Sequence, residues 1–486
     1  MATHEPARCL EFTGREAGIA VLRAEADSVL ASLRRRKIVL HFAGGLMDRT
    51  SAVATLNDAV TAYTDAEADS VFFVHGGGLG ETLRLNLPRI LREALFEILL
   101  RRVLWCVLGK AAKHSVAGAR ASGGLQLPPR DVLEAELTAM RSGIEPDPAR
   151  FTLPELSALT EDETKRLTYI LSLDEDLSRC LRAEEENVMG GALVVSSVHA
   201  GMPADPGRSR SGVLEAAAGF VARKALNAVR AVIERFRGGT HHGLYPTAVE
   251  EILREFCLAP LGGAVWAGMK ADAATAFRTD IDGGPRPGSY FLQRITEMLA
   301  GPEPKEVTVV GHGSGLPLMN AFVAALDAHR SSAVSPLPAD FRVRQVIALA
   351  PACTFADLAA TLRRKGTAFE RFRMFALTDE AETADHLVPL AYPRSLLYFI
   401  SGVLERDARG ASAVVPLAGM ARWYAPGQVT GGAEAEEVRA AVDVEPDSFV
   451  WAPSAGPAGH SCAVRSHAGF QTDATMLASL REIVSE

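Results

Sequence analysis

The chain has 486 residues and a formal net charge of −8, with 48% hydrophobic and 23% charged residues. This composition allows a large buried core and excludes a chain that is disordered throughout. The net negative charge supplies no overall attraction to nucleic acid or to an anionic membrane, so we expect no nucleic-acid partner.

The N-terminal sequence MATHEPARCLEF lacks the basic stretch and apolar run of a secretory signal, so we expect a cytoplasmic protein. The six cysteines are scattered singly, without a C-x-x-C pair. We interpret them as structural thiols rather than as metal ligands or redox centres. No uncharged apolar run reaches the length of about 18 residues that a membrane-spanning helix requires.

Short apolar runs alternate with helical patterns along the chain, which is typical of a mostly parallel sheet flanked by helices. In chain order, the expected strands are residues 38–42, 70–74, 306–310, 343–350, 373–377 and 448–451. Helices are expected over about residues 51–64, 85–113, 318–329 and 472–485. The sequence therefore predicts an α/β fold.

The helix expected from about residue 85 to 113 is amphipathic. Its most apolar part, residues 90–108, is interrupted by charged residues at helical intervals. Packing of this helix against the sheet is the favoured interpretation. The alternative is a peripheral contact of the 90–113 helix with a membrane surface or a partner, helped by Lys110 and Lys113.

Residues 116–304 interrupt the alternation of strands and helices. This stretch is charged and helix-rich, and strands resume after it, which favours an insertion over a separate domain. We therefore expect residues 1–115 and 305–486 to form one core, with a large helical cap at 116–304. Within the cap, His241 and His242 point in different directions and lack a third ligand at i+4, so we expect no metal site and place them at the mouth of a pocket.

The motif GHGSG at residues 311–315 stands directly between a strand and a helix. It resembles the nucleophile elbow of the α/β-hydrolase superfamily, whose motif is G-x-S-x-G. In that elbow the serine has a strained backbone, and small flanking residues let the strand and helix approach closely. Aligning Gly311 and Gly315 with the outer glycines of the motif puts Gly313 at the nucleophile position.

Three explanations for Gly313 stay open. The protein is a natural pseudoenzyme, or it is a variant that has lost its serine, or Ser314 takes over as the nucleophile. The resemblance makes Ser314 the donor of a backbone N–H to the oxyanion, so its side chain would attack only after the turn is rebuilt. A glycine-rich turn that binds an anion at a helix N-terminus is a further alternative, although the motif lacks the lysine and spacing of a P-loop.

The resemblance also implies an acid after the second following strand and a histidine after the last strand. Asp385, in the run D-H-L-V-P, is the expected acid, and Asp379 is the alternative. Either carboxylate has the structural interpretation of a loop residue or helix cap. His467, just before the terminal helix, is the expected base, with His460 as the alternative, because an imidazole can accept a hydroxyl proton while a carboxylate fixes its tautomer.

The oxyanion hole of the superfamily takes one backbone N–H from the loop after its third strand. The loop HFAGGL resembles this loop, which makes Ala43 and Gly44 the expected donors, with Gly45 behind them and the Ser314 N–H as the partner donor. The sequence HGGG at residues 75–78 is a rival. It follows the strand that would be the fourth, which is one strand too late for the fold.

The resemblance covers about residues 35–115 and 300–486. It implies an esterase- or lipase-like serine hydrolase that acts on an acyl ester or related bond through an acyl-enzyme, without a cofactor or metal. Its partner would be a small-molecule acyl substrate, and no oligomeric state is indicated. The alternative function is a catalytically inactive pseudohydrolase that binds a small molecule or a protein.

Overall fold

The computed structural model divides the chain into two compact units, which are described separately. Unit 1 consists of Met1–Glu81, Ala264–Asp385 and Pro416–Glu486, and unit 2 of Thr82–Gly263 and His386–Val415. The structure describes residues 8–12, 19–44, 49–75, 79–112, 127–186, 192–202, 210–258, 260–278, 287–332, 335–338, 340–406, 414–425, 428 and 432–486.

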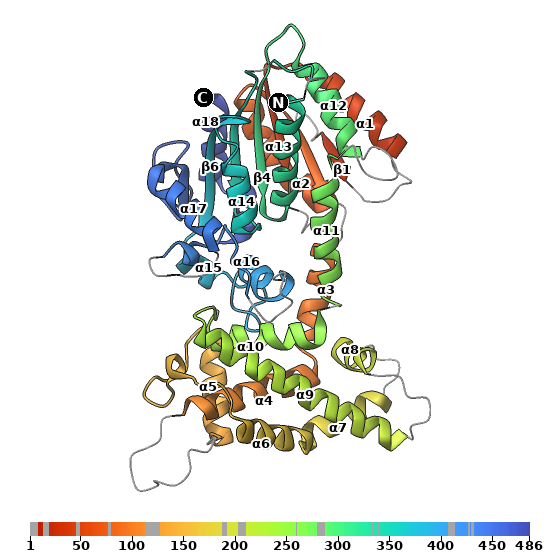
Figure 1. The fold of residues 1–486 in the computed structure, drawn as a ribbon, viewed down its shortest axis with the longest axis vertical. Helices are drawn as coiled ribbons and strands as arrows, with labels where there is room; N and C mark the ends of the chain where they lie inside the picture. The colour runs from red at the N-terminus through yellow and green to blue at the C-terminus, as the bar shows by residue number, and fades with distance from the viewer. Residues whose placement is uncertain are drawn as a thin grey trace. The chain divides into compact units, whose positions relative to one another are not determined.

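Unit 1 contains a sheet in which all seven strands of the described residues pair in parallel. The strands are β1 (Cys9–Phe12), β2 (Lys37–Phe42), β3 (Ala68–His75), β4 (Glu306–His312), β5 (Val343–Leu349), β6 (Phe369–Leu377) and β7 (Phe449–Ala452). They lie in the order β1-β3-β2-β4-β5-β6-β7 (Figure 1). The prediction of an α/β fold with a mostly parallel sheet is confirmed.

All six expected strands coincide with observed ones, because buried parallel strands appear in sequence as short apolar runs. Strand β6 begins at Phe369, earlier than expected, because Glu370 and Arg371 interrupt the apolar run in its first half. Strand β1 was not predicted. It has four residues, CLEF, and pairs with one neighbour only, so no long apolar run marks it.

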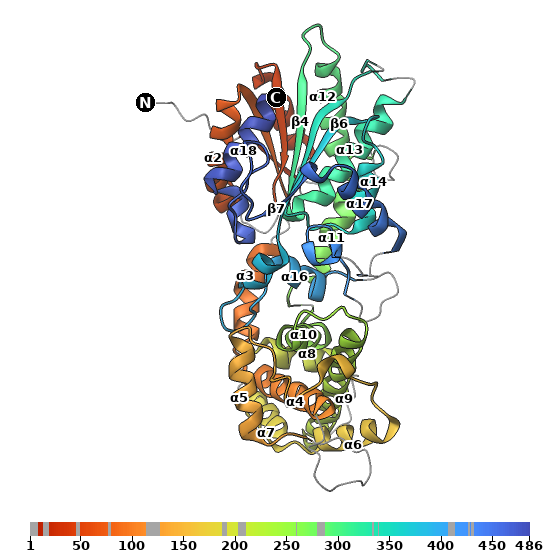
Figure 2. The same cartoon turned by 90° about the vertical axis from the view of Figure 1, so that its left-hand side faces the viewer.

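Helices cover both faces of the sheet. In Figure 2, α2 and α18 lie on one side of the strands, while α13 and α14 lie on the other. The helices of unit 1 are α1 (Ile19–Ser32), α2 (Arg49–Asp65), α11 (Gly263–Thr275), α12 (Pro287–Leu299), α13 (Leu316–Arg330), α14 (Phe355–Leu362), α15 (Asp379–Ala384), α17 (Gly432–Val444) and α18 (Ala474–Ser485). Short 3-10 turns are η4 (Gly313–Gly315), η6 (Ala421–Tyr424), η7 (Pro446–Ser448) and η8 (His467–Gln471).

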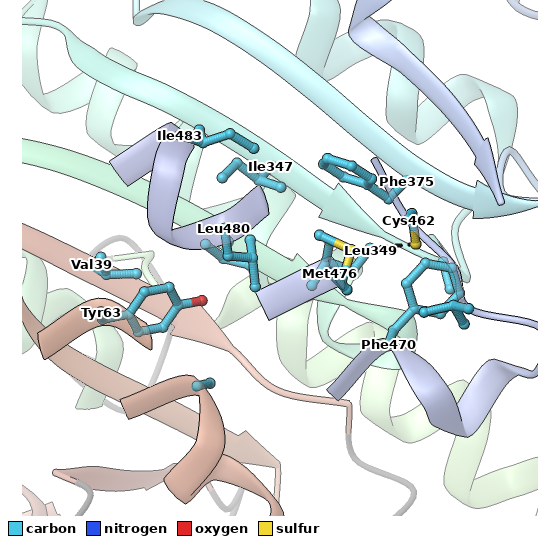
Figure 3. Packing of buried hydrophobic residues seen from close by; sticks show 14 of the residues in the cluster. Val39, Tyr63, Ile347, Leu349, Phe375, Cys462, Phe470, Met476, Leu480 and Ile483 are labelled. Atoms are coloured by element: carbon cyan, nitrogen blue, oxygen red, sulfur yellow. Dashed lines mark hydrogen bonds between the residues drawn. The ribbon is translucent and has the colours of Figure 1, made fainter. Parts of the chain in front are cut away.

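The core between the sheet and the α2–α18 layer holds η8 in place. Figure 3 shows Leu480 and Met476 of α18 beside Ile347 and Phe375 of the sheet. Phe470 of η8 belongs to the same buried cluster and is only 1% exposed. Burial of one such side chain contributes about 1.5–3 kcal/mol, so Phe470 anchors the turn that carries His467.

The direction of the chain across the sheet reverses between β2 and β4. Strand β3 lies on one side of β2, and β4 lies on the other side. Strands β5, β6 and β7 then follow β4 in order toward the edge of the sheet. In open α/β sheets, ligands bind at such a switch point, beyond the carboxyl ends of the strands. Here those ends are Phe42 and His312, so residues 43–44 and 313–315 lie at the expected place.

Unit 2 is built from helices, and no β-strand is found among its described residues. Its elements are α3 (Leu79–Ile90), α4 (Ala94–Ala111), α5 (Arg130–Arg141), η2 (Leu153–Glu155), α6 (Glu161–Ser172), α7 (Glu175–Glu186), α8 (Leu193–Gly201), α9 (Arg210–Arg237), α10 (Leu244–Ile252), η3 (Leu253–Cys257), α16 (Leu396–Phe399) and η5 (Ile400–Leu404). Helix α3 starts just before the boundary of the unit. The unit therefore contains part of the stretch expected as a cap. It also contains residues 386–415, which lie in the second half of the chain.

The single helix expected over 85–113 is two helices, α3 and α4. Helix α4 packs against α9 and α10 within unit 2 rather than against the sheet. Its apolar side chains, among them Leu99 and Val103, are fully buried there. The apolar face of α4 is covered by other helices of unit 2. None of the helices in the described part of the chain has the length and apolar content needed to cross a membrane.

Candidate functional site

The turn after β4 gives Gly313 a conformation that few other residues adopt. Strand β4 ends at His312, and residues 313–315 form the turn η4 before α13 begins. Gly313 has a φ of +50°, in the left-handed region that favours glycine. The strand, turn and helix thus follow one another without spare residues, as the GHGSG motif predicts.

The outer glycines of the motif are required by close packing. A Cβ on Gly315 would collide with the carbonyl oxygen of Phe42 and lie 2.7 Å from that of Ala43. A Cβ on Gly311 would lie 2.7 Å from Sδ of Met319 in α13. Both positions therefore need glycine so that α13 can approach the sheet.

His467 approaches the turn at Gly313. A Cβ built on Gly313 would lie 3.3 Å from His467 Nε2, the nearest atom to that position. A serine at 313 would carry its hydroxyl on this Cβ, within reach of the imidazole. The structure therefore brings together Gly313 and His467, two positions that the sequence analysis assigned to one site.

Asp385 reaches His467 through the main chain. The Asp385 carboxylate accepts a hydrogen bond of 2.8 Å from the backbone N–H of His467. The ring atom Nδ1 of His467 is buried, with no hydrogen-bond partner among the described residues. In a serine-hydrolase triad the carboxylate binds Nδ1–H and sets the tautomer. Asp385 therefore positions the backbone of His467 but makes no such bond to its ring.

His312 and Gln471 complete the surroundings of His467, and the sequence analysis did not single out either residue. The rings of His312 and His467 stack with centroids 5.8 Å apart and planes at 24°. Nδ1 of His312 lies 2.8 Å from Nε2 of Gln471, which is in the same turn as His467. Two features of the sequence could have indicated these residues. His312 lies inside the GHGSG motif, and Gln471 follows His467 by four residues.

The imidazoles at this site are neutral at neutral pH. Burial lowers the pKa of His467 to about 4. Burial also lowers the pKa of His312 well below 6.5, with positive charge on His467 and His41 as lesser causes. Removing a charged imidazole from water is unfavourable, which explains the direction of both shifts.

One of the expected oxyanion donors is already in use. The backbone N–H of Ala43 donates to the carbonyl of Phe73 at 2.9 Å, so Ala43 extends the sheet and cannot serve as a donor without breaking this bond. Gly44 stays a candidate, since a Cβ on it would lie 3.3 Å from the carbonyl oxygen of His312 and 3.7 Å from the Ser314 hydroxyl. Gly45 and the rival glycines 76–78 lie outside the described residues.

Ser314 lines a different part of the site. Its side chain is 7% exposed and borders a narrow pocket of about 10 Å³, roughly the space of one water molecule. His467 is absent from the described lining of this pocket. The lining residues are Ala43, Trp266, Met269, Lys270, Ala273, Ser314, Gly315, Pro317 and Leu318. Ser314 therefore faces α11 and α13, whereas His467 approaches Gly313.

The alternative acid and base have other positions. Asp379 is the first residue of α15. His460 Nδ1 lies 3.0 Å from the carbonyl oxygen of Asp447, a contact that fits a loop residue. The geometry thus associates Asp385, rather than Asp379, with His467.

The histidine pair of the expected cap has packing roles in unit 2. His242 is 1% exposed, and its Nδ1 lies 2.9 Å from a carboxylate oxygen of Glu250. The His241 ring stacks on Phe236 with centroids 4.0 Å apart. The expectation that His242 lines a pocket mouth is wrong, because Glu250 holds it in the interior.

The arrangement offers a turn in the left-handed backbone region, a neutral imidazole and a carboxylate, without a hydroxyl at residue 313. In the part of the chain that the structure describes, no three His, Cys, Asp or Glu side chains are grouped as a metal site. Comparisons with models of known protein families, with curated proteins and with solved structures gave no match.

Proposed function

We propose that this chain is a hydrolase-type α/β protein that has lost its serine nucleophile and binds an acyl ester or related small molecule without forming an acyl-enzyme. The observation that carries the proposal is the relation between Gly313 and His467. Gly313 has a φ of +50°, and its missing Cβ would lie 3.3 Å from His467 Nε2. Serine at this position would have the geometry of an activated nucleophile, and glycine supplies no oxygen to attack.

The state of the imidazole supports a binding role. A general base works best with a pKa near the working pH, and burial lowers the pKa of His467 to about 4. In addition, no described residue accepts a hydrogen bond from His467 Nδ1, so nothing at that atom stabilises the imidazolium formed during catalysis. The site thus lacks both the nucleophile and an optimised base.

An esterase that acts through Ser314 is the second candidate. It is favoured by the position of the Ser314 hydroxyl on a pocket with apolar walls, including Trp266 and Leu318. Such an enzyme would need His467 to reach Ser314 instead of residue 313, and therefore a rearranged turn. The two candidates differ in which residue a serine-directed reagent would modify.

The test uses a fluorophosphonate probe and short-chain p-nitrophenyl esters on four proteins: the parent, Gly313→Ser, Ser314→Ala and the double variant Gly313→Ser/His467→Ala. We expect no labelling of the parent or of Ser314→Ala. Gly313→Ser should gain slow labelling that the double variant lacks, because His467 is the described base closest to the new hydroxyl. Thermal unfolding of each variant checks that it is folded.

Two outcomes would contradict the proposal. Labelling of the parent that disappears in Ser314→Ala would establish Ser314 as the nucleophile. A folded Gly313→Ser that stays unlabelled would end the hydrolase interpretation. Weak ester turnover alone is not decisive, since loss of a triad member leaves about 10³–10⁴-fold acceleration over water in the best-studied enzymes.

A further inference from the structure

Helix α9 carries basic residues on one of its faces. It has 28 residues, and Phe220, Arg223, Asn227 and Arg230 follow one another at spacings of three and four residues. Residues at these spacings lie on one face of a helix. The apolar positions between them are buried in contacts with other helices of unit 2, whereas Arg223, Asn227 and Arg230 are exposed. This basic face therefore lies toward solvent.

The same face borders a pocket at the end of α8, the helix that packs against α9 (Figure 1). The pocket is lined by Gly201, the last residue of α8, and by residues from the stretch 220–230 of α9, all of which belong to unit 2. Its volume is about 380 Å³, within the range of about 300–1,000 Å³ that is usual for small-molecule sites. The pocket beside Ser314, by contrast, has room for about one water molecule. The structure therefore offers room for an organic ligand at the end of α8.

Phe220 and Leu226 supply the apolar part of the pocket wall. A Cβ built on Gly201 would lie 2.9 Å from Cζ of the Phe220 ring, so glycine at residue 201 lets the end of α8 approach this ring. The ring is half-buried, and the Lys224 ammonium lies 5.9 Å from its centroid. Small-molecule sites combine apolar and aromatic walls with a few polar groups. An organic ligand therefore fits this pocket better than a bare inorganic ion.

The cations of the pocket outnumber the carboxylates that pair with them. Arg223, Lys224 and Arg230 line the pocket, and none of its described lining residues is acidic. Lys224 forms an ion pair of 2.9 Å with Glu255. No described carboxylate lies within ion-pair distance of Arg223 or Arg230, although Arg230 donates to the Thr164 hydroxyl at 3.4 Å. Two cations of the pocket are thus available to an anionic ligand.

A phosphate monoester matches this arrangement of donors. The guanidinium group of arginine presents its N–H groups in a planar fork that fits phosphate oxygens. A phosphate monoester carries a charge of about −1.5 to −2 at pH 7, which matches two cations better than the single charge of a carboxylate does. Arg223 and Arg230 are about 10 Å apart along the helix axis, so their long side chains can contact one phosphate from both sides. The amide of Asn227 lies between them in the helix and adds a further N–H donor.

From these features we infer that the pocket at the end of α8 binds a phosphate monoester of an aromatic or other apolar group. Arg223, Asn227 and Arg230 donate to the phosphate, and Phe220 contacts the organic part. This site lies in unit 2 and goes beyond the function proposed for the turn after β4, which lies in unit 1. Its test does not involve the fluorophosphonate probe, so either proposal can fail while the other holds.

Isothermal titration calorimetry of the full chain with phenyl phosphate tests the class of ligand. Phenyl sulfate is the singly charged analogue of nearly the same shape, inorganic phosphate lacks the ring, and phenol lacks the charge. We expect phenyl phosphate to bind at least about 10-fold more tightly than each of the other three, since loss of one charge-assisted contact or of the ring contact weakens binding by about that factor. Equal binding of phenyl phosphate and phenyl sulfate, or of phenyl phosphate and inorganic phosphate, would overturn the inference.

Arginine variants of α9 locate the site. Arg223→Gln and Arg230→Gln each remove one cation from the pocket and should weaken phenyl phosphate binding about 10-fold or more. Arg237→Gln is the matched control, because it makes the same change at an exposed position of α9 outside the pocket lining, and it should bind like the parent. Thermal unfolding of the three variants should stay close to that of the parent, since all three side chains are exposed. Equal weakening in all three would mean a general attraction of anions to the helix and would overturn the inference.

Phe220→Leu tests the aromatic wall, with thermal unfolding as the check that the variant is folded. It should weaken the binding of phenyl phosphate more than that of inorganic phosphate, because only phenyl phosphate has a ring that contacts residue 220. Equal effects on both probes would contradict the contact between Phe220 and the organic part of the ligand.

Vesicles distinguish a soluble phosphate monoester from one that belongs to a lipid. Phosphatidic acid has such a headgroup, so the parent and Arg223→Gln are sedimented with phosphatidylcholine vesicles that contain or lack phosphatidic acid. Binding to phosphatidic acid that Arg223→Gln lacks would assign the site to a lipid headgroup, and phenyl phosphate binding without vesicle binding would assign it to a soluble ester. A folded parent that binds neither phenyl phosphate nor these vesicles would overturn the inference.

Discussion

The carboxylate of Asp385 holds His467 by its backbone N–H, at 2.8 Å, and not by its ring. This bond joins the end of α15 to the turn η8 and decides where the imidazole lies. Because Asp385 binds the main chain of His467, it fixes the position of this residue. The tautomer of the His467 ring depends on the other groups around the ring.

Asp385→Ala should destabilise unit 1 by about 1–3 kcal/mol, because it leaves the His467 N–H without its charged acceptor. Asp385→Asn keeps an oxygen acceptor, so its free energy of unfolding should fall less than that of Asp385→Ala. Urea unfolding measures the change in the free energy of unfolding. Asp379→Ala is the comparison, and a loss as large as that of Asp385→Ala would show that the bond to His467 is not what stabilises the turn.

Gly315→Ala should destabilise the protein by about 1–3 kcal/mol or prevent folding, because its Cβ meets the carbonyl groups of Phe42 and Ala43. Gly268→Ala in α11 is the matched control. A Cβ at Gly268 has open space around it, and helix propensity favours alanine there by about 0.5–1 kcal/mol. Thermal unfolding should therefore shift in opposite directions for the two variants. A downward shift for both would contradict the packing argument.

Acid should destabilise unit 1 through its buried histidines. Burial lowers the pKa of His41 to about 3 and that of His467 to about 4, below the ordinary value of 6.5. Between these pKa values the unfolded chain therefore binds more protons than the folded chain. The contribution of the neutral histidines to the free energy of unfolding is full above pH 6.5 and is lost as the pH falls toward the pKa values of the folded state. Each group accounts for a loss of about 2 kcal/mol between neutral pH and pH 5.

The measurement is the free energy of unfolding of the parent and of His41→Phe at pH 7.5 and at pH 5. His41 contacts the Tyr63 hydroxyl at 3.0 Å, so the variant also loses stability at both pH values. The difference between the two pH values should nevertheless be smaller in the variant. An identical difference in both proteins would mean that the pKa of His41 in the folded state stays near its ordinary value.

Glu250→Gln should destabilise unit 2 by about 3–5 kcal/mol, because it breaks a buried ionic network. Glu250 is fully buried and contacts Arg235 at 2.6 Å, His242 at 2.9 Å and the Tyr392 hydroxyl at 2.5 Å. Proximity of His242 and Arg235 lowers the pKa of Glu250 to about 2 against the opposing effect of burial. The carboxylate is therefore charged under all ordinary conditions.

The control for this prediction is Glu161→Gln, which removes an exposed i,i+4 ion pair with Lys165 in the same unit. Surface pairs of this kind contribute about 0.3–0.5 kcal/mol. Limited proteolysis and urea unfolding compare the two variants. If Glu250→Gln is as stable as Glu161→Gln, the network is not a structural requirement of unit 2.

The fold class could be predicted because it depends on local patterns. Apolar runs such as residues 38–42 and 306–310 are recognisable without knowledge of their neighbours, and they are strands β2 and β4. The GHGSG turn is equally local, since the need for glycine at residue 313 arises from its own φ. The chain order of Asp385 and His467 pointed to one site, and the structure bonds Asp385 to His467 and brings His467 near Gly313.

Only the tertiary structure decided how these residues are used. Whether Asp385 binds the ring or the backbone of His467, and whether the Ala43 N–H is occupied by the sheet, depends on atoms from distant segments meeting within a few ångströms. The same holds for α4, whose amphipathic sequence fits a sheet, a membrane or other helices equally well until its neighbours are known. Sequence periodicity specifies which face of an element is apolar, and the contacts between segments determine what covers it.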